Sequence, residues 1–185
     1  VYDRANYRGG HLTSIASKVV EKVIGNPLIA YLEEQGYEDS QWGFRKQSSS
    51  RDLVLVCVPY WILAACVKCK IGTFFGDVTA AFDRVCKTFL LAKLHSLGIS
   101  DVFLDFLNDY LEARIGHVTI DGVLSEVIEL VSMVFQGIVL GPSLWNGFFH
   151  EVVEPAKHND DTAAMFAAAV FADDLNVFKQ FPVEV

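Results

Sequence analysis

Two adjacent carboxylates, Asp173 and Asp174, interrupt an otherwise apolar segment over residues 169–178. The apolar residues on both sides favour two β-strands joined by a tight turn, so the pair is expected at the tip of a hairpin. Neighbouring ionised carboxylates repel each other and raise each other's pKa, and cations beside them would stabilise the pair. Carboxylate oxygens suit Mg²⁺. An isolated Asp-Asp pair is also typical of a solvated turn, and the rest of the chain must decide between the two interpretations.

A third carboxylate, Asp77, follows residues 70–76, which are rich in β-branched and aromatic side chains and predict a strand. If this strand and the hairpin are neighbours in one antiparallel sheet, Asp77 converges with Asp173 and Asp174. Three converging carboxylates are what two-metal phosphoryl transfer requires. In that chemistry the protein mainly positions groups and neutralises charge.

The elements that must position these carboxylates are helices mixed with antiparallel hairpins. Helical periodicity is found over residues 14–24, 83–97, 101–114 and 144–153, and hairpins are expected over 116–130 and 163–181. In the first helix Gly25-Asn26-Pro27 is a stop signal, and Lys18, Glu21 and Lys22 are expected on the solvent side. The pattern predicts an α+β fold, with an antiparallel sheet backed by helices on one face.

Composition and charge limit the class of protein. With 185 residues, of which 52% are hydrophobic, the chain is expected to form one globular domain or a piece of one. The net charge of −8 argues against a generic nucleic-acid binder. The first 100 residues carry a net charge of +3 and the last 85 carry −11. Such a division fits a protein that binds phosphates with one part and metal ions with the other, and it also fits chance surface variation.

Residues 53–67 form an apolar run that contains Pro59. A membrane-spanning helix needs about 20 residues, so a buried and kinked helix is the better prediction. The four cysteines are Cys57, Cys66, Cys69 and Cys86, and among them Cys66 and Cys69 have metal-ligand spacing without a second close pair. This pattern favours reduced, buried thiols of an intracellular protein over a zinc site. The chain opens on Val1, with neither an initiator Met nor an apolar leader, as expected of an internal fragment.

The most basic stretch covers residues 41–52 and includes Arg45, Lys46 and Arg51. These cations are as well explained by phosphate contacts as by a solvated loop. The serines directly before the apolar run predict a helix N-cap.

Five segments of the chain resemble motifs of reverse transcriptases, specifically those of non-LTR (LINE-type) retrotransposons. Three resemble the catalytic motifs A, B and C, and two upstream segments resemble motifs of the polymerase fingers. The resemblance extends over nearly all of the chain and favours the metal site over the solvated turn. The three catalytic segments are Asp77-Val78-Thr79-Ala80-Ala81-Phe82-Asp83-Arg84-Val85, Phe135-Gln136-Gly137-Ile138-Val139-Leu140-Gly141-Pro142-Ser143-Leu144-Trp145-Asn146 and Phe171-Ala172-Asp173-Asp174. The two fingers segments are Asn6-Tyr7-Arg8-Gly9-Gly10-His11-Leu12-Thr13 and Gln41-Trp42-Gly43-Phe44-Arg45.

The resemblance implies a role for each of several residues. The metal ligands would be Asp77, Asp173, Asp174 and the backbone carbonyl of Val78, holding two Mg²⁺ ions for which Mn²⁺ could substitute. Phe82 would be the steric gate that excludes a ribose 2′-hydroxyl, although a Phe at such a position is otherwise an ordinary core aromatic.

Four further residues of the resembling segments are implied in substrate binding. Gly137 would let the backbone approach the nascent base pair, and Gln136 would fix that loop or bind nucleotide or template. Arg8 and Arg45 would bind the triphosphate.

The resemblance also implies an architecture and partners. The fold would be a right-hand polymerase with fingers over about residues 1–70 and palm over 71–185, with the thumb absent. The substrates would be an RNA template, a DNA primer and deoxynucleoside triphosphates. The protein would be intracellular, without a membrane association, and nuclear at the integration step; its oligomeric state stays open.

Two other classes of protein remain as alternatives. One is an inactive relic of a reverse transcriptase, or the same fold reused as an RNA-binding scaffold. The other is an RNA-dependent RNA polymerase or an intron maturase, and Phe82 argues against the RNA polymerase.

Overall fold

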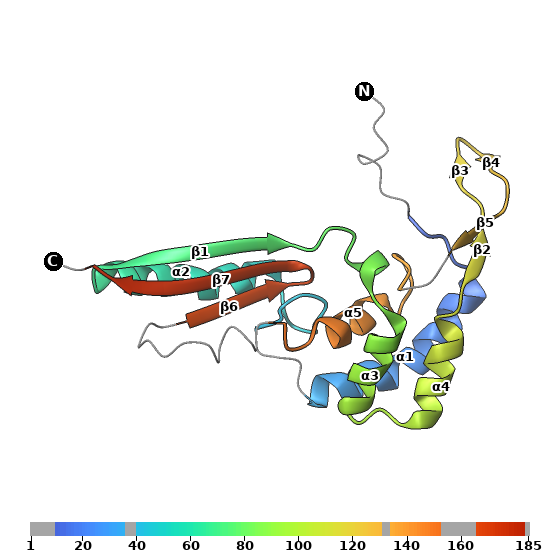
Figure 1. Ribbon diagram of the computed structural model, residues 1–185, viewed down its shortest axis with the longest axis horizontal. Helices are drawn as coiled ribbons and strands as arrows, with labels where there is room; N and C mark the ends of the chain where they lie inside the picture. The colour runs from blue at the N-terminus through green and yellow to red at the C-terminus, as the bar shows by residue number, and fades with distance from the viewer. Residues whose placement is uncertain (1–9, 36–39, 131–133, 153–165, 184–185) are drawn as a thin grey trace. The chain divides into compact units, whose positions relative to one another are not determined.

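The computed structural model describes residues 10–35, 40–130, 134–152 and 166–183. Helices and antiparallel sheets are mixed along the chain, which confirms the predicted α+β class (Figure 1). The chain forms two compact units, one of Val1–Ala30 with Phe82–Phe148 and one of Tyr31–Ala81 with Phe149–Val185. The helical segments are α1 (Ile15–Gln35), α2 (Ser50–Cys66), the 3₁₀ turn η2 (Phe82–Arg84), α3 (Lys87–Ser96), α4 (Asp101–Tyr110) and α5 (Gly141–Phe149). The strands are β1 (Cys69–Asp77), β2 (Arg114–Gly116), β3 (Thr119–Ile120), β4 (Val123–Leu124), β5 (Ile128–Leu130), β6 (Phe166–Phe171) and β7 (Asp174–Pro182).

The second unit is built on a three-stranded antiparallel sheet in the order β1-β7-β6, with α2 against one face (Figure 1). Phe178 in the central strand is 2% exposed, and its ring contacts Tyr60 and Trp61 of α2 and Phe75 of β1. Leu53, Cys57 and Ala169 complete this core. The predicted strand over residues 70–76 and the predicted hairpin near the end of the chain are both present, and they are neighbours in the sheet.

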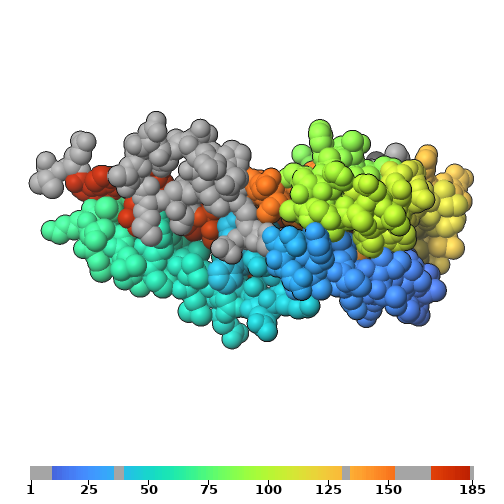
Figure 2. Space-filling model, turned by 90° about the horizontal axis from the view of Figure 1, so that it is seen from below, coloured from blue at the N-terminus to red at the C-terminus, as the bar shows by residue number. Residues whose placement is uncertain are grey.

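Helix α2 begins with the predicted serine cap. Ser49 accepts a hydrogen bond from the backbone N–H of Asp52, and the Asp52 carboxylate accepts one from the backbone N–H of Ser49, which forms a capping box. The prediction of a buried helix was wrong, because only the side that faces the sheet is buried. The opposite side lies at the surface (Figure 2), where Val54, Leu55, Ile62 and Leu63 are exposed. No helix among the described residues is long and apolar enough to cross a membrane.

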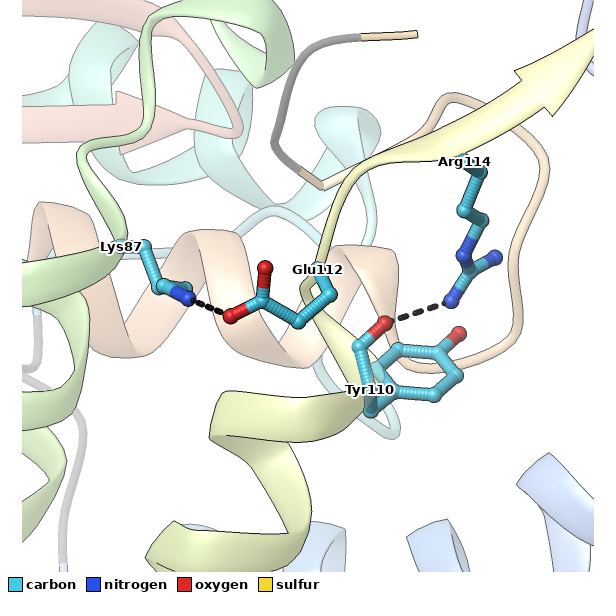
Figure 3. Close-up of polar contacts among 4 residues, drawn as sticks. All are labelled: Lys87, Tyr110, Glu112 and Arg114. Carbon is cyan, nitrogen blue, oxygen red and sulfur yellow. Dashed lines mark hydrogen bonds and ion pairs between the residues drawn. The ribbon is translucent and has the colours of Figure 1, made fainter. Parts of the chain in front are cut away.

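The first unit contains α3, α4 and α5 and two short hairpin sheets, β2 with β5 and β3 with β4. Its core includes the fully buried side chains of Leu94, Leu107, Leu144 and Trp145. Figure 3 shows two polar contacts within this unit, an ion pair and a hydrogen bond. Lys87 pairs with Glu112 at 2.5 Å and thereby lowers the pKa of that carboxyl. Arg114 donates to the backbone carbonyl of Tyr110 at 2.7 Å.

The predicted end of the first helix was wrong, because α1 continues through Gly25-Asn26-Pro27 to Gln35. A proline removes one intrahelical hydrogen bond, here the bond to the carbonyl of Val23. Pro27 and Val23 are both exposed, so water can take the place of the missing donor. The predicted faces were wrong in part: Lys22 is exposed as expected and Lys18 is half-buried, but Glu21 is buried. The apolar side chains of Ile15, Val19, Val20 and Val23 are exposed.

Other predicted elements exist with different bounds. The helix predicted over residues 83–97 is divided into η2 and α3, and the helix over 101–114 ends at Tyr110. The helix predicted over 144–153 is α5, which begins and ends earlier. In the predicted hairpin over 116–130, Asp121 and Gly122 form the turn with positive φ at both residues, 50° and 80°. Such a pair of angles is typical of the two-residue turn that Asp-Gly favours.

The four cysteines are free thiols. Cys57 is buried, as expected, and burial raises its pKa. Cys66 and Cys86 are exposed and Cys69 is half-buried, so the expectation that all four are buried was wrong.

Candidate active site

The pairing of β1 with β7 places Asp77 directly opposite Asp174. Asp77 is the last residue of β1 and Asp174 is the first residue of β7, so both carboxylates lie at the same end of the sheet. Residues paired in this way have Cα atoms about 4.5–5.5 Å apart in antiparallel strands. Ala172 and Asp173 form the two-residue connection between the paired residues Phe171 and Asp174. Asp77 and the adjacent pair Asp173 and Asp174, which are distant from it in sequence, therefore meet at one end of this sheet.

The charges of these three residues interact. The pKa of Asp174 is raised, first by burial of part of its carboxyl and then by the negative charges of Asp173 and Asp77. Asp77 and Asp174 remain exposed, and Asp173 is half-buried. Solvent therefore reaches a site at which negative charge is concentrated.

The donor set suits a hard divalent cation, because it consists of carboxylate oxygens whose repulsion a cation would relieve. Within the described ranges, no three His, Cys, Asp or Glu side chains are already gathered as a ready metal centre. The three aspartates thus fit Mg²⁺ in chemistry and in backbone placement, and their side chains would have to turn toward a bound ion. Val78, whose carbonyl is the fourth predicted ligand, directly follows Asp77 and is half-buried.

The hairpin that carries Asp173 and Asp174 is supported by residues 40–43, which sequence reasoning assigned no role in the site. The backbone of Trp42 donates to the carbonyl of Val170, and Val170 donates to the carbonyl of Ser40, both at 2.7 Å. The side chain of Gln41 hydrogen-bonds the backbone of Ala172. The resemblance to a fingers motif singled out this segment, but nothing local in the sequence indicated which part of the chain it contacts.

Arg45 is half-buried, and its guanidinium donates to the backbone carbonyl of Gln41 at 3.1 Å. Together with Glu33, Lys46 and Gln47 it lines a pocket of about 310 Å³. Lys46 also pairs with Glu33 at 3.5 Å. Arg8, the other predicted triphosphate ligand, lies outside the described residues.

Phe82 belongs to the other compact unit, where it begins η2. Its ring is half-buried and lies 5.8 Å from the ring of Trp145, as expected of a core aromatic. This contact accounts for an aromatic residue at the position, and the steric gate stays a prediction.

Gln136 and Gly137 lie in a loop over residues 134–140 of the same unit as Phe82. Gln136 is exposed, and its backbone carbonyl accepts a hydrogen bond from the backbone N–H of His11 at 3.3 Å. Gly137 has a φ of 103°, and a Cβ there would lie 2.9 Å from the carbonyl oxygen of His11. Close packing against His11 therefore already requires glycine at position 137. Glu21, which sequence reasoning placed in solvent, accepts a hydrogen bond from the backbone N–H of Val139 in this loop.

Comparison with known proteins identifies relatives along almost the whole chain. The family model described as reverse transcriptase (RNA-dependent DNA polymerase) matches residues 3–184. The chain is 30% identical over 178 residues to the RNA-directed DNA polymerase from mobile element jockey of Drosophila melanogaster. This alignment covers 95% of the chain and 19% of the relative. It is 29% identical over 174 residues to the probable RNA-directed DNA polymerase from transposon X-element of the same organism. This second alignment covers 94% of the chain and 19% of the relative.

The chain spans about a fifth of the length of these curated relatives. A further similarity, 27% over 114 residues, is to the retrovirus-related Pol polyprotein from type-1 retrotransposable element R2 of Popillia japonica, covering 59% of this chain and 19% of that relative. The predicted resemblance to reverse transcriptases of non-LTR retrotransposons is thus confirmed. The chain belongs to the reverse transcriptase (RNA-dependent DNA polymerase) family.

Proposed function

We propose that the chain is the fingers and palm part of an RNA-directed DNA polymerase that copies the RNA of a non-LTR retrotransposon. In this proposal a primer 3′-hydroxyl attacks the α-phosphorus of a deoxynucleoside triphosphate. A new bond forms between the 3′-oxygen and that phosphorus, the hydroxyl proton is lost to solvent, and the bond to pyrophosphate breaks. The division into fingers over about residues 1–70 and palm over 71–185 is part of the proposal, as is action in the nucleus at the integration step.

The observation that carries the proposal is the register of β1 and β7, which sets Asp77 opposite Asp174, the residue that follows Asp173. In the proposed site these three carboxylates and the carbonyl of Val78 would hold two Mg²⁺ ions. Such ions lower the pKa of an attacking hydroxyl and neutralise a leaving pyrophosphate. The role of the chain would be to keep the three acidic residues at one end of the sheet, where burial and then their mutual repulsion raise the pKa of Asp174.

Other residues would position the substrates. Arg45 lines a pocket with Lys46, and its planar guanidinium would bind two oxygens of the triphosphate. Arg8 would take part in the same contact. Phe82 would exclude a ribose 2′-hydroxyl, and the loop of Gln136 and Gly137 would face the nascent base pair.

The direct test is primer extension on an RNA template by the natural polypeptide that contains this sequence. We expect deoxynucleotide incorporation with Mg²⁺, and a loss of at least about 100-fold in kcat on Asp77→Asn or Asp174→Asn, because each removes charge stabilisation from the reacting phosphate. Asp83→Asn, which changes an exposed aspartate that is not one of the proposed metal ligands, is the matched control and should leave kcat unchanged. Extension that survives both site substitutions would refute the assignment.

Nucleotide preference separates this function from the alternatives. A reverse transcriptase prefers deoxynucleotides, and Phe82→Val should admit ribonucleotides. An RNA polymerase would prefer ribonucleotides before any substitution. A relic or scaffold would show no extension and no change in melting temperature with Mg²⁺ and a deoxynucleotide.

A further inference from the structure

A side chain from a distant part of the sequence holds the tip of the β6–β7 hairpin. Oε1 of Gln41 accepts hydrogen bonds from the backbone N–H of Ala172 at 3.0 Å and from that of Gly43 at 2.8 Å. Nε2 of Gln41 donates to the backbone carbonyl of Ala172 at 3.3 Å. Gln41 and Ala172 are 8% and 7% exposed, so these bonds are shielded from water. Both ends of one side-chain amide are therefore engaged by the same turn residue.

Ala172 needs such support because its backbone conformation is unfavourable. Its φ is 59°, in the left-handed region that a residue with a Cβ rarely adopts. Two-residue hairpin turns usually place Gly, Asn or Asp at such positions. Alanine has neither the freedom of glycine nor a polar side chain that could bond its own backbone. Contacts from elsewhere in the fold must hold the turn.

The backbone around Gln41 is fitted to the same turn. A Cβ on Gly43 would lie 2.1 Å from the backbone nitrogen of Ala172, so no side chain is possible there without displacement of the hairpin. Gln41 also forms an isolated parallel bridge with Val170, which fixes the position of its side chain along β6. The side-chain amide of Gln41 and the lack of a side chain at Gly43 thus both allow this segment to pack against the backbone of Ala172.

We propose that Gln41 is a positioning residue: it holds Ala172 in the left-handed turn and so fixes the backbone from which Asp173 and Asp174 extend. This inference rests on the proposed function, in which those carboxylates bind divalent cations. Hydrogen bonds that orient metal ligands from behind commonly change metal affinity 10- to 100-fold, roughly, when they are removed.

The test measures Mn²⁺ binding to the chain by electron paramagnetic resonance, in the presence of a deoxynucleoside triphosphate. Gln41→Met keeps the length of the side chain and removes all three hydrogen bonds. We expect it to weaken Mn²⁺ binding by about tenfold or more. Cys57→Ala, in the core of the same unit, is the control for general destabilisation. It should lower the melting temperature without changing Mn²⁺ affinity.

A second variant separates positioning from mere stability. Ala172→Gly removes the cost of the positive φ, so the turn needs the amide less. In the Gln41→Met background it should restore most of the Mn²⁺ affinity. Hydrogen exchange adds a readout that needs no metal: the amide of Ala172 should exchange faster in Gln41→Met than in Cys57→Ala.

The outcomes distinguish this inference from the proposed function. Unchanged exchange at Ala172 in Gln41→Met, or Mn²⁺ affinity equal to that of the wild type, overturns the positioning role. A loss of affinity in Cys57→Ala as large as in Gln41→Met also overturns it. A wild-type chain that binds no Mn²⁺, or binds it equally well after Asp174→Asn, overturns the proposed function and with it the inference.

Discussion

The carboxylate of Glu21 accepts a hydrogen bond from the backbone N–H of Val139 at 2.6 Å, with only 2% of the glutamate exposed. The hydroxyl of Ser17 donates to the same carboxylate at 3.1 Å. The pKa of Tyr110 is raised to about 12, first by burial and then by the charge of Glu21, which disfavours the phenolate. Glu21 is therefore a buried anchor of α1 for the loop over residues 134–140.

Replacing Glu21 with Ala should lower the free energy of unfolding by about 1–3 kcal/mol, because the amide of Val139 would lose its acceptor. Glu21→Gln keeps an acceptor oxygen and should cost less. Urea denaturation measures both effects. Lys22→Ala, at the exposed neighbouring position, should change stability by about 0.5 kcal/mol or less. Equal losses at positions 21 and 22 would contradict the buried anchor.

Gly137→Ala and Gly122→Ala form a matched pair. Both glycines have positive φ, but a Cβ at Gly122 would meet nothing within 4 Å, whereas one at Gly137 would lie 2.9 Å from the carbonyl oxygen of His11. We expect a loss of about 1 kcal/mol for Gly122→Ala from the backbone alone. The loss for Gly137→Ala should be larger, about 2–3 kcal/mol, because steric displacement is added. Thermal unfolding compares them, and equal losses would show that the contact with His11 is easily relieved.

The raised pKa of Asp174 predicts how stability depends on pH in the absence of divalent cations. The folded chain holds this proton more tightly than the unfolded chain, whose ordinary value is 3.8. The resulting stabilisation is present below that value and is lost as the pH rises through the raised pKa. Asp174→Asn should therefore raise the melting temperature at about pH 7, and the difference should shrink as the pH is lowered below the ordinary pKa.

The control for this prediction is Asp83→Asn, which alters an exposed aspartate of η2. It removes the same net charge without removing charge from the Asp77–Asp174 end of the sheet. If both substitutions raise the melting temperature equally at neutral pH, the effect comes from the overall net charge of −8 and not from repulsion within the site.

Phe178→Ala should be the most destabilising of these substitutions. Its ring is 2% exposed and lies 6.0 Å from the ring of Tyr60 and 5.5 Å from that of Trp61. Truncation of such a residue costs about 3–5 kcal/mol. Phe74→Ala, on the same sheet but with 61% exposure, should cost about 1 kcal/mol or less. Chemical denaturation would contradict the described core if the two losses were alike.

Features set by neighbouring residues could be predicted from the sequence. The Asp121-Gly122 turn, the serine cap of α2 and the hairpin around Asp173 are all specified within a few residues. The strand that ends at Asp77 has a local signature as well. Its pairing with β7 came from a hypothesis about function, because no local pattern states which strands are neighbours.

The roles of Glu21 and Gln41 could not be predicted, because their partners lie 118 and 131 residues away along the chain. A charged residue on a helix is usually solvated. Glu21 is buried instead, because its carboxylate accepts a hydrogen bond from the backbone N–H of Val139 in a distant loop. The end of α1 was misplaced for a related reason. Gly25 and Pro27 are local stop signals, but the helix continues because burial of Leu28 and Leu32 further on outweighs them.

The order of the sheet gives its two facing aspartates unequal freedom. Among the described residues, Asp174 belongs to the middle strand, which is paired along both sides, whereas Asp77 belongs to an edge strand with one neighbour. An edge strand leaves half of its backbone groups without a partner in the ladder. The backbone around Asp77 is therefore held by fewer hydrogen bonds between strands than the backbone around Asp174.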